Sequence, residues 1–258
     1  MTIIQSIILG IIEGVTEFLP ISSTGHLILA SKLMGIADAD FTKSFEIIIQ
    51  FGAILAVVVL YWKRLLQSKE LWKKVLVAFL PTAIVGFLLY KVLKNFLLSN
   101  DAIVLWSLFL GGVILIVFEL WYKAKNRVTV TQVQDINYKK SFWTGLVQSL
   151  AIIPGVSRSG ATIVGGMIMG ISREAIIEFS FLLAIPTMAA AAGYDLLKSS
   201  HHFSGSQIGV LTLGFVVSFL VALVSIKWLV SYIKNHTFIA FGIYRIAVAL
   251  LFWLLVIH

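Results

Sequence analysis

Apolar residues dominate long stretches of this chain, and short polar segments separate them. Six of the apolar stretches have few charged residues and the length of about 20 residues that a helix needs to cross a bilayer. They lie at about 43–62, 75–95, 102–122, 173–192, 207–231 and 238–257. The pattern therefore predicts six transmembrane helices and an all-α integral membrane protein.

Two further apolar stretches are each broken near the middle by a proline. Pro20 divides residues 2–36, and Pro154 divides residues 141–171. The resulting half-helices are too short to cross a bilayer comfortably, and proline interrupts a helix. We expect each stretch to form a re-entrant pair of helices, which enters and leaves the membrane on the same side.

The composition agrees with this interpretation. Of the 258 residues, 59% are hydrophobic and only 12% are charged, and the mean hydropathy of +0.99 is too high for a soluble domain of this size. Cysteine is absent, which excludes disulfides and thiolate chemistry. The formal charge of +8 is concentrated in two short loops, 63–74 and 123–140. Such loops are a topology signal rather than a surface for nucleic acid.

The two basic loops predict the orientation of the chain. Because basic loops stay in the cytoplasm, we expect both to be cytoplasmic. Repeat one (1–122) and repeat two (141–258) of a single membrane domain then each hold one re-entrant pair and three spans. Since that number of crossings is odd, the second repeat is inverted, and the two re-entrant pairs meet near the midplane. In the loop between the repeats, the Val-Thr-Val-Thr run at 128–131 predicts a small β-hairpin.

The first broken stretch carries a dense set of polar residues at 13–26, Glu-Gly-Val-Thr-Glu-Phe-Leu-Pro-Ile-Ser-Ser-Thr-Gly-His. Glu13 and Glu17 are four residues apart and share one helix face. Because carboxylates inside a membrane are costly and usually functional, we expect metal ligands or a general base. The alternative is a solvated pair near the interface. His26, three residues after Ser23, is a candidate general acid/base or nucleophile, or else a structural histidine.

The second broken stretch has a similar plan at 148–162, Gln-Ser-Leu-Ala-Ile-Ile-Pro-Gly-Val-Ser-Arg-Ser-Gly-Ala-Thr. Arg158 lies between Ser157 and Ser159 at the start of a helix. A guanidinium, two hydroxyls and free helix N–H groups all suit a phosphate. The alternative is an arginine that extends to the lipid headgroups.

Other polar residues lie inside the predicted spans. Glu46, Gln50 and Glu178 are expected to support the site, whereas Glu119 is expected at the membrane interface. A weak internal match, Gly-Ile-Ile-Glu at 10–13 and Gly-Leu-Val-Gln at 145–148, supports two related repeats.

Together the two motifs resemble the signature sequences of the BacA/UppP family of undecaprenyl-diphosphate phosphatases, and the similarity covers essentially the whole chain. The resemblance implies an enzyme of the bacterial inner membrane that hydrolyses undecaprenyl diphosphate to undecaprenyl phosphate and inorganic phosphate. Such an enzyme recycles the carrier lipid for cell-wall synthesis, and bacitracin resistance follows. The resemblance also implies a divalent cation, Mg2+ or Ca2+, and a site open to the outer face.

The resemblance assigns roles to particular residues of this sequence. The catalytic residues are Glu17, Ser23, His26 and Arg158. The phosphate-binding residues are Ser22, Thr24, Ser157, Arg158, Ser159 and Thr162. The metal ligands are Glu13 and Glu17. Three attacking groups remain open: Ser23 activated by Glu17 or His26, which we favour, His26 itself, or metal-bound water.

A lipid or anion transporter is the alternative function, because inverted repeats with an anion site at the midplane are transporter architecture. The expected partners are a polyprenyl diphosphate lipid and the bilayer, with no nucleic acid. The sequence leaves open whether the protein is a homodimer and which lipid chain length it prefers.

Overall fold

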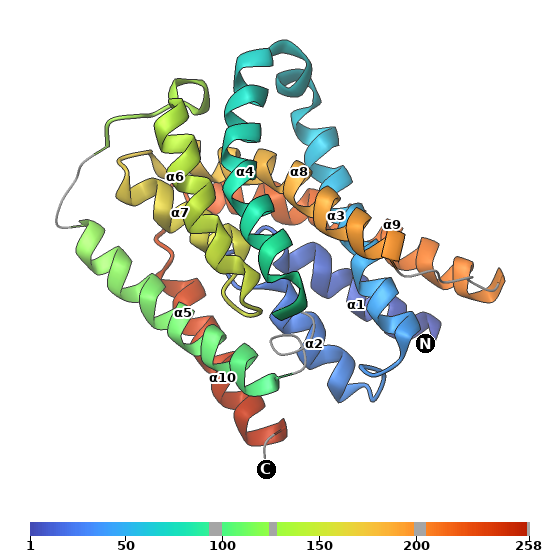
Figure 1. Ribbon diagram of the computed structural model, residues 1–258. Helices are drawn as coiled ribbons and strands as arrows, with labels where there is room; N and C mark the ends of the chain where they lie inside the picture. Colours follow the sequence, from blue (N-terminus) through green and yellow to red (C-terminus); the bar gives the residue numbers. More distant parts are fainter. Residues whose placement is uncertain (93–99, 124–127, 199–204, 257–258) are drawn as a thin grey trace.

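The protein is described here by a computed structural model, which covers residues 1–92, 100–123, 128–198 and 205–256. These residues fold into helices joined by short links (Figure 1). The α-helices are α1 (Ile3–Thr16), α2 (Ser23–Leu33), α3 (Asp40–Gln67), α4 (Lys69–Val92), α5 (Asp101–Lys123), α6 (Tyr138–Gln148), α7 (Arg158–Ile168), α8 (Arg173–Lys198), α9 (Gly205–Tyr232) and α10 (Ile239–Val256). Two 3-10 helices, η2 (Val133–Asp135) and η3 (Ser149–Ile152), flank α6.

Five helices are long and apolar enough to cross a membrane, and they coincide with five of the six predicted spans. The qualifying segments are Asp40–Leu66, Lys69–Leu89, Asp101–Lys123, Arg173–Tyr194 and Gln207–Tyr232. The sixth predicted span corresponds to α10, whose apolar segment Ile239–Leu254 is shorter. The chain is therefore a multi-pass helical membrane protein.

Both proline-containing stretches form pairs of short helices, as the sequence predicts. α1 has 14 residues and α2 has 11, and α6 and α7 have 11 each. At 1.5 Å per residue, the longest of these four helices measures about 21 Å, less than the roughly 30 Å of the hydrocarbon core. None of the four can cross a bilayer alone. We keep the predicted term as a label and call α1–α2 the first re-entrant pair and α6–α7 the second; their course in the membrane stays a prediction.

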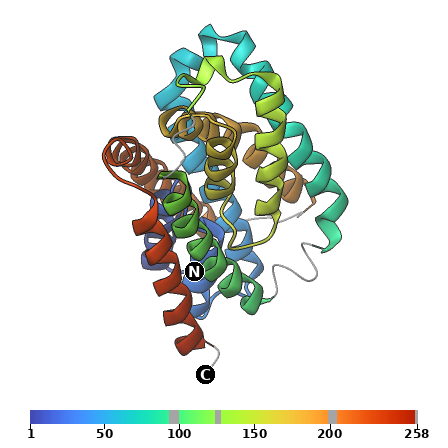
Figure 2. The same cartoon turned by 90° about the vertical axis from the view of Figure 1, so that its left-hand side faces the viewer.

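The main helix contacts join elements that are far apart in the sequence. α1 packs along α9, α6 packs along α4, and α5 packs along α10, the last two lying side by side in Figures 1 and 2. A glycine permits the close approach in the first two cases. A Cβ atom added to Gly10 would lie 2.8 Å from the carbonyl oxygen of Gly214, and one added to Gly145 would lie 1.8 Å from that of Ala78. Small residues allow such backbone contact between membrane helices.

The span with the largest buried share is α8, which packs against the first turn. Of its membrane-spanning window, 61% is buried. Phe18, in the turn after α1, meets Phe181 of α8 edge to face, with ring centroids 5.3 Å apart. Both phenylalanines are fully buried. This contact places the turn of the first re-entrant pair inside the protein rather than at its lipid-facing surface.

The predicted β-hairpin at 128–131 is wrong. Val130 instead forms an isolated parallel bridge with Ile171, just after α7. The N–H groups of Thr129 and Val130 donate to the carbonyl oxygen of Gly170, at 2.8 and 3.1 Å. The run finds its partner in the end of the second re-entrant pair because a hairpin of four residues cannot bury enough surface to be stable alone.

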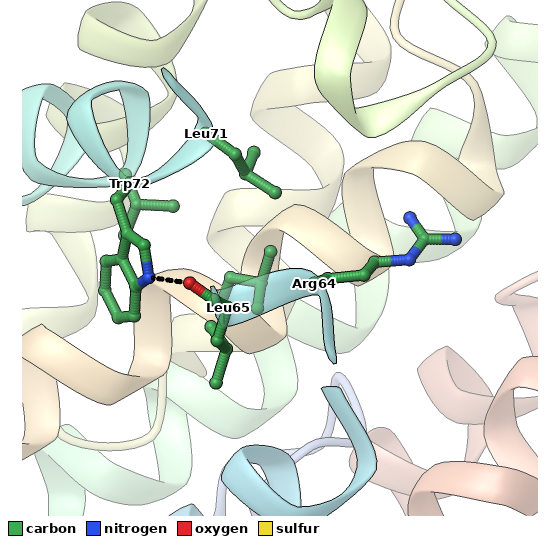
Figure 3. A pocket seen from close by; sticks show the side chains of 6 residues that line it. Arg64, Leu65, Leu71 and Trp72 are labelled. Atoms are coloured by element: carbon green, nitrogen blue, oxygen red, sulfur yellow. Dashed lines mark hydrogen bonds between the residues drawn. The ribbon is translucent and has the colours of Figure 1, made fainter. Parts of the chain in front are cut away.

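A hydrogen bond and side-chain packing hold the link between α3 and α4. The indole Nε1 of Trp72 donates to the carbonyl oxygen of Leu65, 2.8 Å away (Figure 3). The small hollow beside these residues leaves no room for a ligand. Arg64 points away from Trp72 in Figure 3 and pairs with Glu178 of α8. This end of the molecule therefore serves structure, and the candidate site must be sought at the re-entrant turns.

Candidate active site

Two serines introduce the second helix of each re-entrant pair with the same unusual backbone. Ser22 has φ 73° and Ser157 has φ 77°, and among the described residues they are the non-glycine positions with positive φ. Each serine caps the helix that follows, Ser22 by accepting from the N–H of Gly25 at 3.3 Å and Ser157 by accepting from that of Gly160 at 3.1 Å. A left-handed non-glycine residue costs about 1–3 kcal/mol and is frequent at functional sites.

A carboxylate, a hydroxyl and a guanidinium meet between the two turns. The hydroxyl of Ser23 donates to Oε2 of Glu17. Nη2 of Arg158 lies 3.3 Å from Oε1 of the same carboxylate. Glu17 is 8% exposed and Ser23 is 6% exposed. The expectation that the two motifs come together is confirmed, since Glu17 and Arg158 belong to different re-entrant pairs.

Further contacts hold the second motif against the first. Nη1 of Arg158 donates to the carbonyl oxygen of Ser180 in α8 at 2.9 Å. The hydroxyl of Ser159, fully buried, donates to the carbonyl oxygen of Phe18 at 2.8 Å. The Arg158 side chain is only 12% exposed and lies inside the protein. An arginine that extended to the headgroups would not be enclosed in this way.

Glu13 is fully buried, and no described group donates a hydrogen bond to either carboxylate oxygen. The charged groups that act on it are Glu17, Glu46 and Arg158. A buried carboxylate without a hydrogen-bond donor needs a proton or a cation. A divalent ion beside Glu13 would meet this need. No cluster of three metal-ligating side chains is found in the described ranges. Two carboxylates suit Mg2+, which keeps several waters and takes further oxygens from a phosphate substrate.

His26 is held by α10 and not by Ser23. Its Nδ1 lies 2.8 Å from the carbonyl oxygen of Ser22, and its Nε2 lies 3.0 Å from the hydroxyl of Tyr244. The two rings are stacked, with centroids 5.5 Å apart. Because a carbonyl only accepts, Nδ1 carries the hydrogen, and Nε2 of the neutral ring accepts from Tyr244. Of the two groups expected to activate Ser23, the geometry brings Glu17 to it and leaves His26 aside.

Thr162 lies in a hydrogen-bond network that joins the second re-entrant pair to α4 and α8. Its hydroxyl donates to the carbonyl oxygen of Arg158 at 2.8 Å and lies 3.3 Å from Oε1 of Gln148. Nε2 of Gln148 donates to Thr82 and Thr187, at 3.0 and 3.2 Å. The Thr162 side chain is thus turned toward helix contacts. Of the expected phosphate-binding hydroxyls, only that of Thr24 belongs to a half-buried residue, in the first turn of α2.

The acidic residues of the long helices have separate surroundings. One carboxylate oxygen of Glu46 is buried with no hydrogen-bond partner among the described atoms, and its supporting role at the site stays a prediction. Glu119 is 2% exposed, pairs with Arg173 at 2.8 Å and accepts from the N–H of Phe238 at 2.9 Å. Glu119 thus joins α5, α8 and the start of α10, and its depth at the membrane interface stays a prediction.

Arg245 of α10 is a residue near the turns that the sequence analysis missed. It is 1% exposed and donates to backbone carbonyl oxygens of both turns, including Pro20 at 3.2 Å and Gly155 at 2.8 Å. A signal existed, because an arginine in the middle of an 18-residue apolar helix is itself a reason to suspect function.

The fold and the site define a class of protein. It is a multi-pass membrane protein in which two interrupted helices place a hydroxyl, a carboxylate and an arginine together below the surface. Helix N-termini and an arginine favour an anion, and a hydroxyl next to a carboxylate is an activated nucleophile.

Comparison with known proteins gives the family. The family model described as "Bacitracin resistance protein BacA" matches residues 6–251. An undecaprenyl-diphosphatase of Aquifex aeolicus is 52% identical over 252 residues, which cover 98% of each chain. That of Persephonella marina is 50% identical over 257 residues, 100% of each chain. That of Bdellovibrio bacteriovorus is 50% identical, with 99% of this chain and 96% of its own covered. The chain belongs to the BacA family.

Proposed function

We propose that this chain is an undecaprenyl-diphosphatase, which removes one phosphate from undecaprenyl diphosphate and so supplies the monophosphate carrier lipid for cell-wall synthesis. Relatives that carry this name match the chain over its whole length at about half identity. The observation that carries the proposal is the junction of Ser23, Glu17 and Arg158 between the two turns. These groups are the nucleophile, the base and the anion-binding cation of a phosphoryl transfer.

The first half of the reaction uses Ser23 as the nucleophile. Its Oγ attacks the terminal phosphorus while Glu17 takes the hydroxyl proton. The bond from Oγ to phosphorus forms, the bond from that phosphorus to the bridging oxygen breaks, and undecaprenyl phosphate leaves with the electron pair. Glu17 then gives this proton to the departing lipid phosphate and becomes a base again. In the second half, water attacks the phosphoserine and loses a proton to Glu17, which passes that proton to the Ser23 oxygen as its bond to phosphorus breaks. Inorganic phosphate leaves and the Ser23 hydroxyl is restored. Arg158 holds the phosphate oxygens throughout. When the substrate is bound, these oxygens replace the Glu17 carboxylate as the ion-pair partner of Arg158.

The remaining residues of the motifs position these groups. Ser22 and Ser157 cap α2 and α7 and direct the remaining N–H groups of both helix starts toward the phosphates. Ser159 fixes the second turn on Phe18. His26 is assigned to proton exchange with the surroundings through Tyr244, whose ring is 43% exposed.

A divalent cation, Mg2+ or Ca2+, belongs to this proposal. Glu13, whose buried oxygens have no hydrogen-bond donor among the described residues, and Glu17 would hold it. When bound, such an ion neutralises charge on the diphosphate. It would also remove the repulsion between the two carboxylates, which are four residues apart on one helix.

The proposed topology has six spans and two re-entrant pairs in inverted repeats, 1–122 and 141–258, joined by a cytoplasmic loop. Two features support it. The serines at the two turns share one backbone conformation, and the packing of α1 on α9 corresponds to that of α6 on α4 when the repeats are exchanged. We place the protein in the bacterial inner membrane with its site open to the outer face.

Phosphate release in detergent tests the function against the transporter alternative. Purified protein should liberate inorganic phosphate from undecaprenyl diphosphate without any membrane that separates two compartments. A transporter would move the lipid between the leaflets of a vesicle and release no phosphate. Intact diphosphate lipid after incubation with folded, Mg2+-supplied protein would sink the proposal.

A further inference from the structure

Arg245 uses its entire hydrogen-bonding capacity on the backbone around the site. A guanidinium has five N–H groups, and all five donate to carbonyl oxygens. Nε donates to Leu108 at 3.2 Å; Nη1 donates to Pro20 at 3.2 Å and Val156 at 3.0 Å; Nη2 donates to Ser107 at 2.9 Å and Gly155 at 2.8 Å. The arginine thus joins three segments that are distant in the sequence.

Two of these segments are the catalytic turns. Pro20 lies three residues before Ser23, and Val156 lies two residues before Arg158. Their carbonyl groups lie outside the helices, so they lack the partner that a helix would supply and must be satisfied in another way when buried. One side chain therefore sets the spacing between the segment that carries Ser23 and the segment that carries Arg158.

The charge of Arg245 distinguishes it from the other enclosed arginines. Arg158 and Arg173, whose side chains are 12% and 20% exposed, each pair with a glutamate. Within the described part of the chain, the partners of Arg245 are carbonyl oxygens alone, and no carboxylate lies within ion-pair distance. Its positive charge is uncompensated beside the two turns, where the N-terminal ends of α2 and α7 are also positive.

α5 leaves the space that this guanidinium occupies. A Cβ atom added to Gly111 would lie 1.9 Å from Nη2 of Arg245. A glycine at this position is therefore required for Arg245 to reach both turns.

We propose that Arg245 is a positioning residue that holds Ser23 and Arg158 in register and whose unpaired charge draws the diphosphate to the turns. It touches no reacting atom. The inference rests on the proposed function, because it concerns the alignment of the same nucleophile and clamp.

Three variants separate the geometric role from the electrostatic one. Arg245→Lys keeps the charge but loses the planar fork. We expect kcat to fall about a hundredfold, as for a small misplacement of reacting groups, while KM stays within threefold. Arg245→Gln removes the charge as well, and KM should also rise tenfold or more. Gly111→Ala keeps Arg245 but displaces its guanidinium, and kcat should fall at least tenfold.

Two controls and the wild type complete the experiment. Arg173→Lys weakens another enclosed arginine, and Gly209→Ala adds a methyl group where nothing lies within 4 Å; both should keep kcat within threefold. Phosphate release by the wild type tests the proposed function separately. Folded Gly111→Ala with wild-type kcat would overturn the positioning role even if Arg245→Lys does not fold. Equal KM values for Arg245→Gln and wild type would overturn the electrostatic role.

Discussion

The two re-entrant pairs have the same backbone plan and different chemistry. In both, a short helix ends near a proline, and a serine with positive φ caps the next helix. The hydroxyl oxygen of this serine accepts from the N–H of a glycine three residues later. At the position after the capping serine, however, the first pair has Ser23 and the second has Arg158. The same local structure thus supplies two helix starts, which carry different side chains at the corresponding position.

The first helices of the two pairs, α1 and α6, also carry different polar residues at corresponding positions. Gln148 of α6 corresponds to Glu13 of α1, and its amide is satisfied by Thr82 and Thr187. Both carboxylate oxygens of Glu13, by contrast, have no hydrogen-bond donor in the described ranges. In the second pair, the protein itself supplies hydrogen-bond partners to Gln148. In the first pair, Glu13 lacks such a partner, and we propose that a cation takes this place.

The largest effect should come from removing the nucleophile of the first pair. Ser23→Ala should lower kcat by at least about a thousandfold, because no hydroxyl remains beside Glu17 to form the phosphoenzyme. Single-turnover phosphate release by detergent-purified protein measures this. Ser225→Ala is the matched control, since that buried hydroxyl of α9 donates to the carbonyl oxygen of Val221 in its own helix. Activity within tenfold of wild type would move the attacking role to His26 or to water.

Arg158→Lys tests the second pair. A phosphate clamp needs the planar fork of arginine, and lysine provides only a point charge. We expect kcat/KM to fall about a hundredfold, which corresponds to roughly 3 kcal/mol. Size exclusion and thermal unfolding must show that the variant is folded. Near wild-type kinetics would contradict the clamp and shift phosphate binding to the serines of the second turn.

The contrast between Glu13 and Gln148 predicts a difference in metal response. EDTA should abolish turnover, and Mg2+ or Ca2+ should restore it. Glu13→Gln should need at least about tenfold more Mg2+, and its melting temperature should no longer rise when Mg2+ is added, because an ion that binds the folded state stabilises it. The melting temperature reports metal binding even in a variant that has lost its activity. Full activity of Glu13→Gln in EDTA would exclude the cation site.

The smallest effect on activity is expected for two cysteine substitutions that allow each side of the membrane to be labelled. Asp38 follows the first pair, and Gln132 precedes the second; both are exposed. Asp38→Cys and Gln132→Cys should keep wild-type turnover in this cysteine-free chain. An impermeant maleimide should reach position 38 from the outer side and position 132 only after the membrane is opened. Labelling of both from one side would contradict the inverted arrangement.

The sequence alone determined the elements and the reactive groups. Lipid tolerates only segments whose backbone is satisfied internally, so long apolar runs became α3, α4, α5, α8 and α9, close to their predicted bounds. The stretches around Pro20 and Pro154 were correctly predicted to break into short helices, whereas Pro81 and Pro186 lie inside α4 and α8. The re-entrant course of the two pairs stays a prediction. Glu13, Glu17, Ser23 and Arg158 stood out because polar groups in such surroundings are rare.

Only the tertiary structure decided which of these groups meet. Glu17 and Arg158 are 141 positions apart, and no local pattern encodes that contact. The same holds for His26, which faces Tyr244 and not Ser23, and for Val130, which bonds to the end of α7 in place of a local hairpin. Arg245 is the clearest case: its sequence position marks it as unusual, but its link between the two turns exists only because α5 and α10 pack side by side. Local propensity acts over a few residues, whereas a buried donor is satisfied by whatever carbonyl groups the packing of distant helices brings within reach.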